Sequence, residues 1–153
     1  MIQSPNNFFK LSSPVFIASG DIPKIYTCDG LDVNPPLLIS GVPEAAKSLA
    51  LIVDDPDAPF GDFTHWILWN IAPDTAEIKE NSVPPEVVEG TTDFERSGWG
   101  GPCPPSGTHR YRFKLYALDI TLDLPVSARK KELEAAMHGH ILDQTVLVGK
   151  YAR

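Results

Sequence analysis

Two proline-rich loops in this sequence each end in a histidine that opens an apolar stretch. The first is "DDPDAPFGDFTHW", residues 54–66, and the second is "GPCPPSGTHRYRF", residues 101–113. Proline fixes its own backbone and restricts the residue before it, so both loops are stiff approaches to a histidine. We therefore expect His65 and His109 to face each other across one small pocket suited to an anion.

His109 brings a second donor group with it. Tyr111 lies two residues further on, so in an extended strand both side chains point to the same face. An imidazole and a phenol on one face offer two hydrogen-bond donors. Gly100, Gly101 and Gly107 would let a ligand approach the backbone closely, although ordinary turn geometry explains them equally well.

The first loop also carries two carboxylates, Asp55 and Asp57, on either side of Pro56. A carboxylate repels a phosphate, so Asp55 is expected to accept a proton-bearing group: an imidazolium, or the ligand's own hydroxyl or amine. A loop aspartate often bonds neighbouring backbone amides, so we expect Asp57 to act through loop shape more than through charge. Solvated carboxylates in a simple turn are the alternative interpretation of both.

The same aspartates and histidines also suit a divalent metal, so metal-assisted hydrolysis by Asp55, His65 and His109 stays open as an alternative. No HExxH motif marks such a site. Ser106 lacks the strand–turn–helix context that presents a serine nucleophile. With no activated nucleophile visible, we expect a binding protein with no catalytic residue, no metal and no cofactor.

Composition limits the partners. The chain has 153 residues and a formal net charge of −7, which argues against nucleic acid and against binding to anionic membrane surfaces. No apolar run reaches the length of a membrane span, so no stable membrane insertion is expected. The first twenty residues show no signal peptide, which favours a cytoplasmic protein, as a monomer or homodimer.

The cysteines give little guidance. Cys28 and Cys103 are too few for a disulfide framework. In a cytoplasmic chain they are expected to be free thiols. A single bridge is the alternative, since the sequence does not supply the distance that a bridge would need.

Apolar patterning predicts a mainly β domain. Residues 48–55 and 65–72 are apolar at nearly every position, as in strands covered on both faces, whereas residues 111–118 alternate. Residues 36–42 and 145–152 are shorter candidates. Fifteen prolines lie scattered between these runs and indicate turns, so the whole chain, 1–153, is expected to be one domain.

One helix is predicted after the strands. Ser127 is a plausible N-cap, and Leu133, Ala136 and Met137 share one face of the segment that follows. Gly139 supplies a C-terminal stop. A single amphipathic helix among many strands favours a β-sandwich with a helix laid against it.

Several stretches together resemble the phosphatidylethanolamine-binding proteins, also called Raf kinase inhibitor-like proteins, in their short bacterial and archaeal branch. The resemblance extends over nearly the whole chain in the same order. It is carried by "YTCDGLDVNPPL" (26–37), "DPDAP" (55–59), "THW" (64–66), "GGPCPPSGTHRY" (100–111) and "GHILDQTVLVGKY" (139–151).

The resemblance implies a β-sandwich with Greek-key connections, one or two short helices near the C-terminus, and a pocket for phosphate-like anions between the two motif loops. In that pocket the Gly101 amide would donate to the anion, and two prolines would shape the walls. The residues implied to form the site are Asp55, Asp57, Pro59, His65, Gly101, Pro102, His109 and Tyr111.

Two backbone features are also implied by the resemblance. Arg110 would be structural and tie the loops together. Cis peptides would fit the Asp55–Pro56 and Ala58–Pro59 bonds.

The function implied is capture of a phosphate-like or carboxylate anion. Its source would be a phosphorylated small molecule, a lipid head group or a phosphorylated protein. Regulation of a kinase or protease through the pocket rim is a second implied role.

Overall fold

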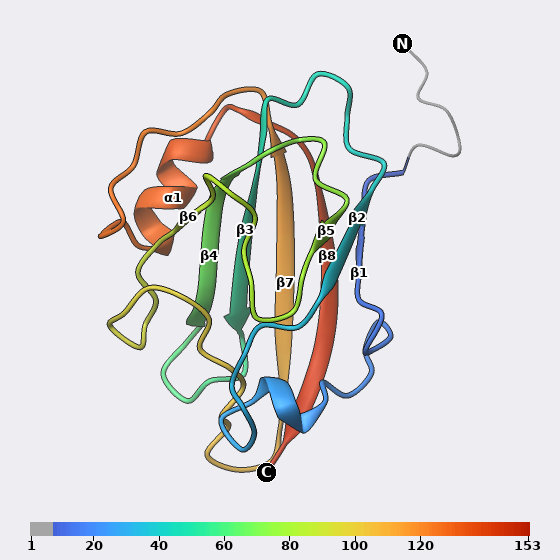
Figure 1. The fold of residues 1–153 in the computed structure, drawn as a ribbon. Coiled ribbons are helices and arrows are strands. Elements are labelled where there is room, and N and C mark those ends of the chain that lie inside the picture. Colours follow the sequence, from blue (N-terminus) through green and yellow to red (C-terminus); the bar gives the residue numbers. More distant parts are fainter. Residues whose placement is uncertain (1–7) are drawn as a thin grey trace.

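In a computed structural model of the protein, residues 8–153 are described, and they form a mainly β structure with two sheets (Figure 1). The predicted fold class is confirmed. The first seven residues, part of the segment expected to lack a signal peptide, lie outside the described residues. The strands are β1 (Lys10–Ser12), β2 (Leu37–Ser40), β3 (Ser48–Asp55), β4 (Phe63–Ile71), β5 (Glu77–Ile78), β6 (Val88–Glu89), β7 (Thr108–Leu118) and β8 (Ile141–Ala152).

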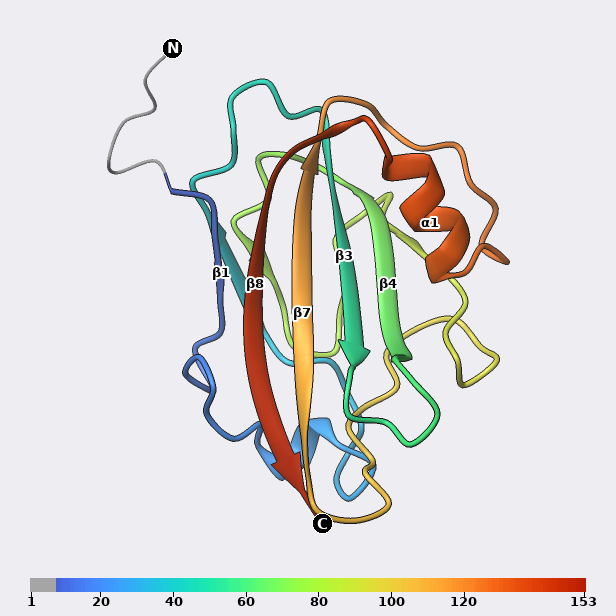
Figure 2. The ribbon, with the colours of Figure 1, turned by 180° about the vertical axis from the view of Figure 1, so that it is seen from behind.

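The named strands pair antiparallel throughout. A small sheet has the order β1-β2-β5, and a larger one has the order β6-β4-β3-β7-β8 (Figure 2). In the larger sheet β3, β4 and β6 are successive neighbours, and β7 returns to lie beside β3. This is the spatial order of a Greek key, as the resemblance implied.

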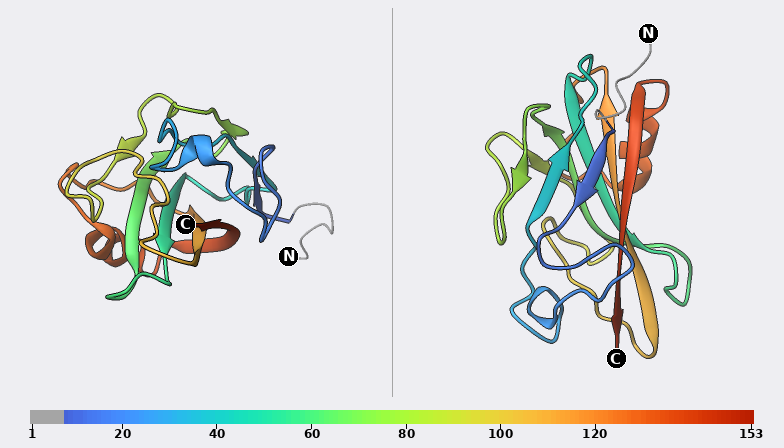
Figure 3. Two further views of the ribbon diagram at one scale, coloured as in Figure 1. Left: turned by 90° about the horizontal axis from the view of Figure 1, so that it is seen from below. Right: turned by 90° about the vertical axis from the view of Figure 1, so that its right-hand side faces the viewer.

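Helix α1 (Lys130–Met137) lies on the outer face of the larger sheet, away from the smaller one (Figure 3). A short 3₁₀ turn, η1 (Lys24–Tyr26), precedes β2. Within residues 8–153 no helix is long and apolar enough to cross a membrane.

Every residue of β3 is buried, because both of its faces are covered. Leu51 and Val53 point into the core between the sheets, while Ile52 packs with Leu133 of α1 on the other side. The continuous apolar run predicted a strand of this kind, and the structure confirms it.

The predicted cap of α1 was wrong. Ser127 lies in the turn before the helix, and Arg129 is the N-cap residue. The backbone N–H of Arg129 donates to Oε1 of Glu132 at 2.8 Å, so an acidic side chain in the first turn supplies the capping bond. The C-terminal stop is as predicted, with Gly139 at φ +82°.

Asp54 anchors α1 to the sheet. Its carboxylate is fully buried and accepts hydrogen bonds from Arg112 Nε at 2.8 Å, Lys114 Nζ at 2.8 Å and Lys130 Nζ at 2.7 Å. Burial opposes ionisation, but these three cationic donors outweigh it and hold the pKa of Asp54 below its ordinary value. Because Lys130 is the first residue of α1, the helix start is fixed to β3 by charge.

We expect Asp54→Ala to lower the free energy of unfolding by about 3–5 kcal/mol, since it leaves three cations around a buried site without a counter-charge. Urea denaturation measures the loss. Asp62→Ala is the matched control, because Asp62 pairs with Arg112 at 3.2 Å but is half exposed, and its loss should stay below about 1 kcal/mol. Equal losses in the two variants would contradict this role for Asp54.

Candidate functional site

The two proline-rich loops meet at one end of the larger sheet (Figures 1 and 2). Between them lies a pocket of about 290 Å³. Its polar groups come from Asp55, His65, His109 and Tyr111, four of the residues that the sequence singled out. Its remaining lining consists of Ala58, Pro59, Phe60, Phe63, Phe94, Cys103, Pro104 and Pro105.

His109 is held by Asp55. The distance from His109 Nδ1 to Asp55 Oδ2 is 2.6 Å, and both side chains are buried. The carboxylate can only accept when ionised, so the bond fixes a proton on Nδ1 and the orientation of the ring. Nε2 is then the ring nitrogen available to a ligand. Asp55 therefore contacts an imidazole, as the charge argument from the sequence predicted.

His65 differs from His109 in the partner of its Nδ1. Its Nδ1 lies 2.6 Å from the backbone oxygen of Gly100, which can only accept, so the proton sits on Nδ1. Burial lowers the pKa of His65 below its ordinary value, with the Gly100 bond and nearby carboxylates acting weakly against that shift. The neutral ring stands edge-on to Tyr111 at 5.2 Å. His65 thus presents an acceptor nitrogen, and not a charged donor, to anything in the pocket.

Tyr111 carries the one unusual polar group of the pocket. Its side chain is 1% exposed, and its hydroxyl has no hydrogen-bond partner among the residues that the structure describes. Burial, and then the charges of Asp55 and Asp57, raise the pKa of Tyr111 and keep the phenol neutral. The backbone amide of Cys103 acts weakly in the other direction without reaching hydrogen-bond geometry. A buried hydroxyl without a partner destabilises the folded state. The fold itself makes no use of this donor, which is therefore left for a ligand.

Asp57 does not line the pocket. Its carboxylate accepts from Arg110 at three points: Nη2 at 2.8 Å, Nε at 3.0 Å and the backbone N–H at 2.8 Å. The amide bond within the loop is made instead by Asp55, whose Oδ1 accepts from the Asp57 N–H at 2.7 Å. The expected role in loop shape stays a prediction, but the partners of Asp57 are the guanidinium and backbone N–H of Arg110 on β7 and not amides of its own loop. The implied role of Arg110 as a tie between the loops agrees with this geometry.

Gly101 and Pro102 lie behind the pocket wall and not in it. The Gly101 N–H donates to Asp32 Oδ1 at 2.7 Å, so it is not free to donate to an anion as the resemblance implied. A side chain at Gly101 would collide with the backbone of Tyr26, which explains the glycine by close packing of the chain. The Pro102 carbonyl accepts from the Cys28 N–H at 3.2 Å.

Cys28 and Cys103 form a disulfide, with their Cα atoms 5.5 Å apart. The expectation of free thiols was wrong, and the alternative of a single bridge is correct. The bridge joins positions 75 residues apart, so only the folded chain reveals their proximity. The resemblance also misled on the backbone: no peptide bond in residues 8–153 is cis, including those before Pro56 and Pro59.

Phe94 is a site residue that sequence reasoning missed. Its ring stands edge-on to His65 at 5.2 Å and to Phe63 at 4.8 Å, and Phe63 stands edge-on to His65 at 5.1 Å. These aromatic rings hold the His65 ring in place. The only sequence signal was an isolated aromatic in a polar, glycine-containing segment.

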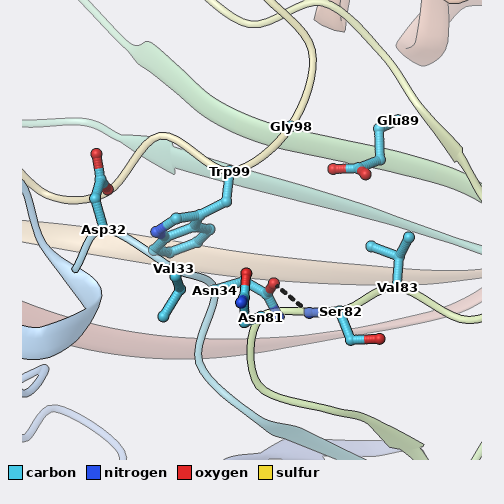
Figure 4. Close-up of a pocket in the computed structure, with 9 residues that line it drawn as sticks. All are labelled: Asp32, Val33, Asn34, Asn81, Ser82, Val83, Glu89, Gly98 and Trp99. Carbon is cyan, nitrogen blue, oxygen red and sulfur yellow. Dashed lines mark hydrogen bonds between the residues drawn. The ribbon is translucent and has the colours of Figure 1, made fainter.

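A second hollow of about 360 Å³ is lined in part by Gly98 and Trp99 (Figure 4). Trp99 lies in the middle of the view, between the carboxylates of Asp32 and Glu89. Several polar groups of this hollow already make hydrogen bonds within the fold: Asp32 Oδ1 accepts from the Gly101 N–H, and Glu89 Oε2 accepts from Trp66 Nε1 at 3.0 Å. The lining is completed by Val33, Asn34, Asn81, Ser82, Val83 and Gly98.

Metal-ligating residues do not gather anywhere in the part of the chain that the structure describes. No group of three or more His, Cys, Asp or Glu side chains there is placed to hold a metal ion.

Comparison with known proteins places this site in a family. The family model for phosphatidylethanolamine-binding proteins matches residues 12–152, which include both loops and all eight strands but the first two residues of β1. The chain belongs to the phosphatidylethanolamine-binding protein family.

Relatives are found in archaea and bacteria. A UPF0098 protein of Pyrococcus horikoshii is 52% identical over 150 residues, covering 92% of this chain and 75% of that protein. A UPF0098 protein of Methanothermobacter thermautotrophicus is 49% identical over 148 residues, covering 94% of this chain and 98% of that one.

Solved structures in the family share the fold. A putative phosphatidylethanolamine-binding protein homologue from Chlamydia trachomatis superposes with a TM-score of 0.92 at 39% identity, covering 96% of this chain and 99% of that chain. E. coli YbcL, described as a new member of the mammalian family, gives a TM-score of 0.89 at 27% identity, covering 95% and 98%.

The Asp57–Arg110 pair leads to a prediction on acid stability. The Arg110 hydrogen bonds lower the pKa of Asp57 from 3.8 to about 2, so the folded state favours the ionised carboxylate. The stabilisation is complete above pH 4 and is lost as the pH falls towards about 2, where the folded protein also takes up the proton. We expect Asp57→Asn to flatten the decline of stability over this range in urea denaturation.

Asp57→Ala should behave like Asp57→Asn, because each removes the charge that Arg110 binds. If Asp57→Asn kept the parent's stability at pH 7 and only Asp57→Ala lost it, loop shape would be the role of this residue after all.

Proposed function

We propose that this protein is a non-catalytic binding protein whose pocket, lined by Asp55, His65, His109 and Tyr111, takes a phosphate-like anion. The observation that carries the proposal is the buried Tyr111 hydroxyl, which has no partner within residues 8–153. It lies beside His109 in the same pocket. Family membership supports a binding role in general.

The recognition chemistry is ordinary. Tyr111 O–H and His109 Nε2–H donate to anion oxygens, and Asp55 balances a charged His109 ring from behind. The neutral His65 accepts from a hydroxyl or a protonated oxygen of the ligand. Because phenylalanine and proline side chains form most of the wall, these few polar contacts act away from water, where they are stronger.

The same walls favour an ester over free phosphate. An apolar or aromatic group attached to the anion would lie against Phe63, Phe94 and Pro59. A phosphorylated small molecule, a lipid head group and a phosphorylated protein all offer such a phosphate ester. Phe60 is fully exposed at the mouth and would contact the rest of a larger partner, including a kinase or protease. We place this activity in the cytoplasm, in a monomer or homodimer without a cofactor.

Metal-assisted hydrolysis is the second candidate. The observation that favours hydrolysis is the Asp55–His109 hydrogen bond, which is the geometry of an oriented general base; within residues 8–153 no group of three ligating side chains is placed to hold the metal. Incubation with phenyl phosphate, with and without added Zn²⁺, tests it. Phosphate release that disappears in His109→Ala would replace the binding proposal by hydrolysis.

Tyr111→Phe separates ligand binding from folding. Removing a buried hydroxyl that has no partner should leave the free energy of unfolding unchanged or raise it. Affinity for phenyl phosphate should fall roughly ten- to a hundred-fold, the loss expected for one hydrogen bond to a charged group. Calorimetric titration and urea denaturation of the same preparation measure both. Unchanged affinity would remove Tyr111 from the site.

His109 should contribute directly to anion affinity. Its ring lines the pocket beside Tyr111, and its Nδ1 is held by Asp55, so Nε2 is left for the anion. Sulfate carries no apolar group, so it probes the polar contacts alone.

His109→Ala should lower sulfate affinity about ten-fold or more, the loss expected for one hydrogen bond to a charged group. His140→Ala is the matched control, since His140 also bonds an aspartate, Asp119, at 2.8 Å but does not line the pocket. Unchanged affinity in His109→Ala, or an equal loss in His140→Ala, would show that His109 does not donate to the anion.

A further inference from the structure

The disulfide joins the pocket wall to a separate part of the chain. Cys103 lines the pocket, while Cys28 lies in the segment that follows η1. We propose that the Cys28–Cys103 bond is a reversible modification site for small thiols, and that its reduction loosens the pocket wall. The affinity effect rests on the proposed function, but the thiol chemistry does not.

Both cysteines are accessible to a small reactant. Each is exposed in the folded chain, although they lie at the border of a buried pocket. Thiol–disulfide exchange requires a thiolate to reach a disulfide sulfur, so access is the first condition for a reversible bond. Most structural disulfides inside a core do not meet that condition.

Reduction would release only a short piece of wall. The Gly101 and Pro102 end stays tied by the bonds to Asp32 and Cys28, and Gly107 exchanges two backbone hydrogen bonds with Arg153, at 3.0 and 3.2 Å. Between these ends, residues 103–106 make no backbone hydrogen bond to any residue that the structure describes. The disulfide is therefore the tether of the segment that carries Pro104 and Pro105 into the pocket lining.

Arg153 decides which sulfur leaves. Its Nη1 lies 3.4 Å from Cys103 Sγ, and a neighbouring guanidinium stabilises a thiolate. Asp29 also faces this guanidinium, at 3.4 Å, and is in turn bonded by the Tyr151 hydroxyl at 2.6 Å, so the cation is partly balanced. Cys103 is still a better leaving group than Cys28, because the guanidinium of Arg153 contacts the Cys103 sulfur directly.

The exchange has two balanced steps. A small thiolate attacks Cys28 Sγ, the Cys28–Cys103 bond breaks, and its electron pair passes to Cys103, which leaves as a thiolate beside Arg153. A second small thiolate then attacks the sulfur of the small molecule in the mixed disulfide. This step releases Cys28 as a thiolate, which takes up a proton, together with a small-molecule disulfide. Two thiols are oxidised and one protein disulfide is reduced.

Affinity for phenyl phosphate tests the effect on the pocket. It is measured for the oxidised protein, for protein reduced by dithiothreitol, and for the double variant Cys28→Ser/Cys103→Ser. We expect the last two to bind on the order of ten-fold more weakly, because the wall is no longer pre-organised. Equal affinity in all three would overturn the proposal, and so would loss of cooperative thermal unfolding in the reduced protein, which would make the bond purely structural.

The thiol chemistry has its own test, which separates the two proposals. If the oxidised protein bound no phenyl phosphate, the proposed function would fail, but the order of exchange would still be measurable. With limiting glutathione, mass spectrometry should find the mixed disulfide on Cys28 and a free thiol at Cys103. Arg153→Gln should slow the exchange about three-fold or more, while Arg153→Lys stays close to the parent. A mixed disulfide mainly on Cys103, or an equal rate in Arg153→Gln, would overturn the mechanism.

Discussion

The end of β3 imposes the constraint on which both faces of this protein depend. Asp54 and Asp55 are neighbours in an extended strand, so their side chains point to opposite faces of the sheet. Both are buried, at 0% and 3% exposure, and a buried carboxylate needs a partner on its own face. On one face Asp54 pairs with three cations, and on the other face Asp55 pairs with a histidine. The first partnership fixes the helix, and the second orients the ring that we propose binds the ligand.

Strand β7 supplies most of these partners through the same two-residue period. Its odd positions, His109 and Tyr111, face the pocket, whereas its even positions, Arg112 and Lys114, face Asp54. Arg110 lies near the strand's start and reaches Asp57 in the first loop. A one-residue slip of β7 against β3 would separate every one of these pairs, so the site and the charge cluster enforce one register together.

Segments of β2, β3, β4, β7 and β8 could be predicted from the sequence, because apolar runs and period-two alternation are local signals, whereas the short strands β1, β5 and β6 were missed. An imidazole was one of the proton-bearing partners that charge allowed for Asp55. The partners of Gly101, Asp57 and Cys28 could not be predicted, since each lies far along the chain and only the Greek-key path brings it close. The predicted N-cap of α1 was wrong for a different reason: Ser127 has a suitable side chain for a cap, but Glu132 bonds the backbone N–H of Arg129, which is the N-cap residue.

Only part of the apolar wall could be predicted from the sequence. Phe63 lies two residues before His65 in β4, so both side chains share a face, but nothing local marks Phe94 as a neighbour of His65. Their packing matters to the account because it keeps His65 neutral and leaves Tyr111 and His109 as the donors. The pocket therefore differs from a surface cluster of charges, in which water would weaken each contact.

A crystal structure of the protein grown with phenyl phosphate at pH 6 tests the central claim most directly. We expect the phosphate oxygens within hydrogen-bond distance of the Tyr111 hydroxyl and His109 Nε2, with Arg110 still bound to Asp57 and the phenyl ring against the aromatic wall. A pocket without the ligand at saturating concentration, or a phosphate held by Arg110 outside the pocket while the Tyr111 hydroxyl stays without a partner, would contradict it.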